Sequence, residues 1–144
     1  MAPLQKRALY SLIIGLILAA GLVAVFTIKG VDTLNGESGY RFIIYSLWVG
    51  VPVVYGILTN LTLRKPAQVD ERDRLIMERS ARTQILGITF SLAAWIIILT
   101  EVYHDTGQVP VIYLTIIFIS VLVISTLSQS LGILIGYWRM DRNA

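Results

Sequence analysis

Four long apolar runs constrain the fold of this chain more than any other feature. They cover about residues 8–28, 42–63, 85–103 and 111–138. A helix needs about 20 mostly apolar residues to cross the hydrocarbon core of a bilayer. No run alternates as a transmembrane β-strand does, and lipid admits only helices or closed barrels. The sequence therefore predicts an all-α, integral membrane four-helix bundle of two antiparallel hairpins, in one domain over residues 1–144.

The basic residues predict how the chain is threaded. Of the 12 Lys and Arg, all but Lys29 and Arg41 lie before the first run, in the charged segment 64–84, or after the fourth run. Basic residues are concentrated in cytoplasmic loops, close to the ends of spans. We therefore expect the N-terminus, the C-terminus and the segment 64–84 to be cytoplasmic.

The residue inventory excludes several kinds of chemistry. The chain has no cysteine and a single histidine, which removes thiolate catalysis, disulfides and multi-histidine zinc sites. Ionisable residues inside a membrane usually mark function, but none stands near the centre of a run, and Glu101 comes nearest. His104, next to Asp105, is a weak metal candidate. We expect no enzyme activity, no catalytic residues, no cofactor and no metal.

The segment VDERDRLIMERSAR, residues 69–82, is the main charged feature. Asp70 is a good N-cap, and Asp73 follows at the third position as in a variant of the capping box. Acidic residues come first and arginines later, as the helix dipole favours. We expect one helix from about Asp70 into the third run, with its first four turns projecting into the cytoplasm and an ion pair between Glu78 and Arg82.

Three interpretations of this helix start remain open. It is a solvated helix with basic residues near the lipid phosphates, a docking surface for a cytoplasmic partner, or a pairing surface for the same helix in a second copy. The docking interpretation assigns contact with the partner to Asp70, Glu71, Arg72, Asp73, Arg74, Glu78, Arg79 and Arg82.

The fourth run contains a second group of regularly spaced residues, which are small or polar. Ser125, Gln129, Gly132 and Gly136 share one helical face. Small residues let membrane helices approach closely, and polar residues bond across the contact. This face predicts packing within the bundle, a homodimer contact, or a polar pathway.

The motif DERDRLI resembles the DERD-x-x-I signature of the DUF2178 family, with Asp70, Glu71, Arg72, Asp73 and Ile76 at the matching positions. This family consists of small bacterial and archaeal membrane proteins without an assigned activity. Their genes are often found beside small helix-turn-helix regulators. The resemblance implies a protein of the prokaryotic cytoplasmic membrane and a cytoplasmic regulatory protein as its partner.

The sequence therefore predicts a non-enzymatic multi-pass membrane protein, structural or regulatory, that presents the Asp70–Arg82 helix to a cytoplasmic partner. The alternative is a small homodimeric transporter or channel that uses the polar face of the fourth run. The expected partners are the lipid bilayer, a second copy in a homodimer, and a cytoplasmic regulatory protein. We expect no direct binding to nucleic acid.

Overall fold

The computed structural model describes residues 2–29 and 71–142, with single residues between them (Phe42, Tyr45, Ser46, Val49, Gly50 and Val53). The described chain is all-helical, with α1 (Pro3–Lys29), α4 (Glu71–Val102) and α5 (Ile112–Arg142) as its long helices. The predicted second span, residues 42–63, lies mostly outside the described residues. The four-span count therefore stays a prediction.

The three long helices have the length and composition of membrane spans. They contain 27, 32 and 31 residues, and each is apolar enough to cross a membrane. At a rise of 1.5 Å per residue, each is about 40–48 Å long. Each is longer than the hydrocarbon core of a bilayer is thick, which is about 30 Å.

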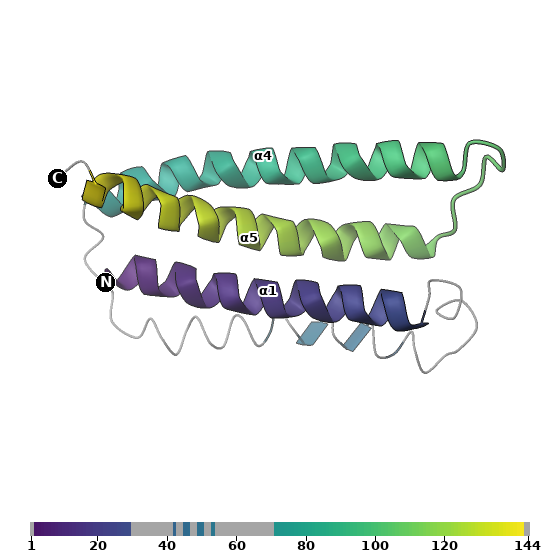
Figure 1. Ribbon diagram of the computed structural model, residues 1–144, viewed down its shortest axis with the longest axis horizontal. Coiled ribbons are helices and arrows are strands. Elements are labelled where there is room, and N and C mark those ends of the chain that lie inside the picture. Colours follow the sequence, from purple (N-terminus) through teal and green to yellow (C-terminus); the bar gives the residue numbers. More distant parts are fainter. Residues whose placement is uncertain are drawn as a thin grey trace.

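Helix α5 packs against both α4 and α1 (Figure 1). α1 and α4 run in the same direction, and α5 returns beside them. Both chain termini and the start of α4 therefore lie at one end of the bundle, which we call the terminal end. The opposite end carries the connection between α4 and α5, and we call it the loop end.

The prediction of one long helix through the charged segment is confirmed from Glu71 onwards. α4 continues without interruption to Val102 and includes Gly87. Its first turn contains Glu71 and Asp73, whose carboxylates favour the positive end of the helix dipole. Asp70, the predicted N-cap, lies outside the described residues.

A short connection joins α4 to α5 at the loop end. Gly107 has φ 62°, a left-handed conformation that glycine adopts without steric cost. Its N–H donates to the carbonyl of Tyr103 at 2.9 Å, and the carbonyl of Pro110 accepts from Tyr113 N–H at 3.0 Å. The two helices are therefore joined by a tight connection that ends near Pro110.

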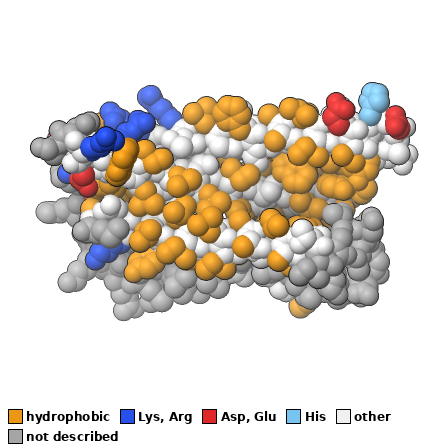
Figure 2. All heavy atoms as spheres, in the orientation of Figure 1, with side chains coloured by type: hydrophobic (Ala, Val, Ile, Leu, Met, Phe, Trp, Pro, Cys, Tyr) orange, Lys and Arg blue, Asp and Glu red, His pale blue; other side chains and the backbone are white. Residues whose placement is uncertain are grey.

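The surface separates charge from apolar side chains. Among the described side chains, Figure 2 shows Lys and Arg gathered at the terminal end with acidic side chains among them, acidic side chains and the histidine without Lys or Arg at the loop end, and hydrophobic side chains between the two ends. Large apolar side chains such as Phe90, Ile96 and Leu114 are more than half exposed. This distribution suits helices whose middle sections face lipid.

Candidate functional site

The charged start of α4 lies against the last turns of α5. Gly136 faces Ile76, whose side chain is 0% exposed, and a Cβ on Gly136 would stand 2.9 Å from the Ile76 side chain. One turn further along, a Cβ on Gly132 would stand 3.0 Å from Cα of Ser80. The two helices therefore approach at backbone distance along this part of their contact.

A small hydrophobic core lies at the same level. Ile76, Ile133, Tyr137 and Ala8 form one cluster of buried residues. Ala8 comes from α1, so all three long helices meet at the terminal end. Ile76 is therefore buried where the three helices meet, and Ser80 is buried against Gly132 of α5.

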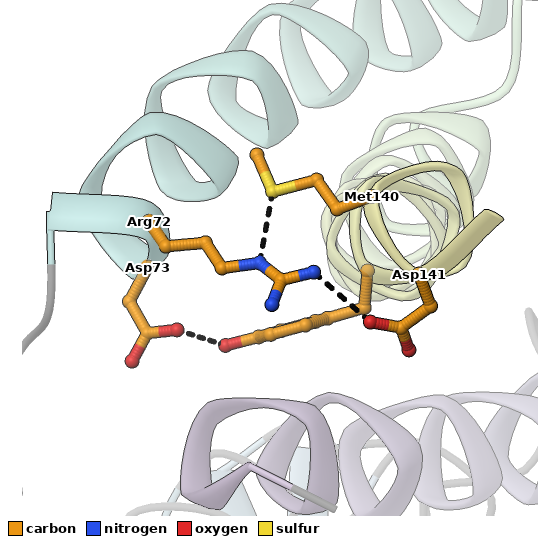
Figure 3. A network of polar contacts seen from close by, with 5 residues as sticks. Arg72, Asp73, Met140 and Asp141 are labelled. Carbon is orange, nitrogen blue, oxygen red and sulfur yellow. Dashed lines mark hydrogen bonds and ion pairs between the residues drawn. The ribbon is translucent and has the colours of Figure 1, made fainter. Parts of the chain in front are cut away.

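Polar side chains join the two helices at their ends (Figure 3). Arg72 Nη2 donates to Asp141 Oδ1 at 2.9 Å, and Arg72 Nε donates to Met140 Sδ at 3.1 Å. Tyr137 donates its hydroxyl hydrogen to Asp73 Oδ1. We call Arg72, Asp73, Tyr137 and Asp141 the terminal clasp. It connects the first turn of α4 to the last turns of α5.

The expectation that the start of α4 projects into the cytoplasm stays a prediction, but this start is not a free helix, because it lies against α5. The register of α4 against α5 places Ile76 beside Gly136 and Arg72 beside Asp141. α5 continues to Arg142, so it accompanies α4 over its whole charged segment. The close approach at the glycines sets this register, because no larger residue would fit there.

The predicted docking residues divide between two faces of α4. Arg72 and Asp73 point toward α5 and belong to the terminal clasp. The remaining described residues of the set are exposed: Glu71, Arg74, Glu78, Arg79 and Arg82. Asp70 lies outside the described residues. The outer face of the α4 start is therefore exposed, whereas its inner face contacts α5.

The outer face contains one ion pair. Arg74 Nε lies 3.7 Å from Glu78 Oε1, and the two side chains are 80% and 66% exposed. The expected pair between Glu78 and Arg82 does not form in the described chain. Side chains on a helix lean toward its N-terminus, which turns Glu78 toward Arg74. Leu75 lies beside this pair and is 50% exposed.

Most of the regularly spaced small and polar residues on α5 contact α4. Ser125 Oγ accepts a hydrogen bond from Gln84 Nε2 at 2.7 Å, and Gly132 and Gly136 contact α4 as described above. Gln129, on the same face, is exposed. Three of these four residues therefore pack against α4 within one chain.

Several residues at this site were not singled out by the sequence analysis. Tyr137 and Asp141 complete the terminal clasp, and Gln84 bonds to Ser125. An aromatic residue near the end of a span was the only available signal for Tyr137. Nothing in the sequence connects Tyr137 to Asp73, since the pairing depends on the helix register.

The described residues contain no group of three or more His, Cys, Asp or Glu side chains that could hold a metal ion. His104 is exposed at the loop end, as are Glu101 and Asp105. The functional groups exposed at the described ends of the bundle are therefore charged and hydrogen-bonding side chains.

No family model, no curated protein and no solved structure matches this chain. The resemblance to the DUF2178 family through Asp70–Ile76 therefore stays a prediction.

Proposed function

We propose that this chain is a multi-pass protein of the prokaryotic cytoplasmic membrane, with four spans and with its terminal end in the cytoplasm. Three described helices are long and apolar enough to cross a membrane. The described charges at the terminal end are mostly basic, whereas Glu101 and Asp105 stand at the loop end. The positive-inside rule assigns the basic end to the cytoplasm.

Accessibility of introduced cysteines tests this orientation, because the natural chain contains none. Glu78→Cys reports on the terminal end and Gln108→Cys on the loop end, and both positions are exposed. In intact cells, a membrane-impermeant thiol reagent should label Gln108→Cys and should reach Glu78→Cys only after permeabilisation. The opposite pattern would contradict the orientation, and labelling of both in intact cells would contradict the membrane crossing.

The function that we propose is non-enzymatic: the protein presents the outer face of the α4 start to a cytoplasmic regulatory partner. The observation that supports this proposal is the division of the segment into two faces. Arg72 and Asp73 fix the helix to α5, while Arg74, Leu75 and Glu78 remain exposed on the other side. A helix held in place by its neighbour offers a preorganised surface, which lowers the ordering cost of binding.

An exchange of the two outer charges tests this proposal without changing net charge. The double variant Arg74→Glu, Glu78→Arg keeps an i,i+4 pair, in the order that stabilises helices better. Affinity purification from membranes with quantitative mass spectrometry should show a soluble protein that wild type captures and the exchanged variant loses. Glu101→Gln, at the loop end, is the matched control and should retain it. Equal capture by all three proteins would contradict docking through this face.

The alternative function, a small homodimeric transporter or channel, has one favourable observation. Gln129 is a polar side chain of a candidate span that remains exposed, and a second copy could cover it. Gln129→Leu should then abolish ion flux into liposomes and shift the protein from dimer to monomer. Wild-type liposomes without flux, or a variant that remains dimeric and active, would contradict this alternative.

A further inference from the structure

Arg79 and Arg82 lie deeper along the bundle than the other basic residues of the terminal end. They stand within one turn of Ser80, which contacts Gly132 of α5. From Gly132 toward the terminal end, the first basic residue on α5 is Arg139. At a rise of 1.5 Å per residue, Arg139 lies about 10 Å along the helix from Gly132. The charged segment of α4 therefore extends beside an uncharged section of α5.

The neighbouring helices present apolar side chains at this depth. Leu131 and Ile135, on either side of Gly132 and Ile133, are 44% and 45% exposed. On α1 the apolar run starts at Ala8, which belongs to the same buried cluster as Ile76 and Ile133. If lipid covers these side chains, the two arginines lie at the level where acyl chains meet headgroups.

Neither arginine is neutralised within the described part of the chain. Both are exposed, and no described side chain forms an ion pair or hydrogen bond with either guanidinium group, since Thr83 Oγ1 bonds only to the backbone carbonyl of Arg79. Glu78, the nearest acid along the helix, pairs with Arg74 instead. Residues three apart on a helix are neighbours, with Cβ atoms about 5–6 Å apart, so the two guanidinium groups can reach one ligand.

We propose that Arg79 and Arg82 bind the phosphate of an anionic phospholipid in the leaflet at the terminal end. A guanidinium group matches phosphate geometry with two parallel hydrogen bonds, and long basic side chains extend toward the interface from such depths. Two unpaired positive charges favour a headgroup with net negative charge over a zwitterionic one. Trp138, 59% exposed with Arg142 5.2 Å from its ring centroid, provides an interfacial anchor on α5.

This inference depends on the membrane location proposed above, but not on a protein partner. It assigns Arg79 and Arg82, two exposed residues of the predicted docking set, to lipid and leaves Arg74, Leu75 and Glu78 to the protein partner. The two proposals can therefore fail separately.

Native mass spectrometry of the full chain tests the lipid site. Protein recovered from membranes is mixed with phosphatidylglycerol or phosphatidylcholine, and retained lipids are counted. Wild type should retain phosphatidylglycerol preferentially, and the double variant Arg79→Gln, Arg82→Gln should lose that preference at least fivefold. Arg74→Gln, one turn nearer the terminal end, is the matched control and should keep it. Equal retention by the double variant and wild type would overturn the proposal.

A second measurement needs no variant. Phosphatidylglycerol should raise the unfolding temperature of wild type in detergent, while phosphatidylcholine and inorganic phosphate should not. A matching rise with inorganic phosphate would show an anion site without lipid selectivity and would overturn the proposal. Wild type recovered outside membranes would overturn both this inference and the membrane location, whereas a membrane protein without lipid preference would overturn this inference alone.

Discussion

The contact between α4 and α5 is built differently at its two ends. At the terminal end, Gly132 and Gly136 bring the backbones together, and the terminal clasp adds charged hydrogen bonds. At the loop end, larger side chains meet: the rings of Tyr103 and Tyr113 are 5.5 Å apart at 71°. Between these ends, Trp95 Nε1 donates to Ser120 Oγ at 2.8 Å.

This difference shows which contacts hold α4 and α5 together and fix their relative position. Helices surrounded by lipid gain little from apolar burial against each other, so close packing and interhelical hydrogen bonds must hold them together. Glycines provide close packing at the terminal end, through Gly132 and Gly136, and in the middle of α4, where a Cβ on Gly87 would stand 2.9 Å from Cβ of Ser128. We therefore expect the contact to be sensitive to side-chain size from the terminal end to Gly87, and to be sensitive mainly to single hydrogen bonds between Gly87 and the loop end.

The largest effect should come from Gly132→Leu. Its Cβ would stand 3.0 Å from Cα of Ser80 and 3.2 Å from Cβ of Thr83, and a backbone atom cannot rotate away. Overpacking costs typically about 1–3 kcal/mol, and we expect the upper part of this range in the free energy of unfolding in detergent micelles.

Gly21→Leu is the matched control for this change, because no described atom lies within 4 Å of a Cβ there. It should leave stability unchanged or raise it slightly, since leucine favours helix over glycine. Equal losses for both variants would show that the close approach at Gly132 does not stabilise the pair.

Tyr137→Phe should have the next largest effect. The ring is 4% exposed and would stay in place, while partly buried Asp73 would lose the tyrosine hydroxyl. Hydrogen bonds to charged groups contribute about 1.5–3 kcal/mol, so we expect a loss near the lower value. Tyr137 has further interactions, and a double-mutant cycle with Asp73→Ala isolates the pair. A coupling energy indistinguishable from zero would contradict this assignment.

These two sites show what the sequence could and could not predict. The acidic residues at the start of α4 predicted its beginning, and the spacing of Gly132 and Gly136 predicted a packing face. The register between α4 and α5 was not predictable, because two apolar helices can slide past each other without changing either pattern. The contact of the α4 start with the last turns of α5 could not be predicted for this reason, and the bond between Tyr137 and Asp73 depends on the same register.

Ser120→Ala tests the middle of the contact and should have a smaller effect. It leaves the indole N–H of Trp95 without its acceptor, and hydrogen bonds between membrane helices average about 0.6 kcal/mol. Ser91→Ala is the matched control, because the buried hydroxyl of Ser91 has no hydrogen-bond partner. We expect Ser91→Ala to be neutral or stabilising. A Ser120→Ala variant as stable as Ser91→Ala in thermal unfolding would argue against this bond.

The smallest effect should come from the pair between Arg72 and Asp141. Its side chains are 44% and 66% exposed, and exposed ion pairs contribute about 0.2–1 kcal/mol. A cycle of Arg72→Gln and Asp141→Asn should give a coupling energy that decreases when salt is raised from about 0.01 M to about 1 M, where the Debye length falls from about 30 Å to about 3 Å. The coupling between Tyr137 and Asp73 should change much less over the same range, because burial shields that pair from ions. If both couplings responded alike, the terminal clasp would act as one solvated surface network and not as a buried bond beside an exposed ion pair.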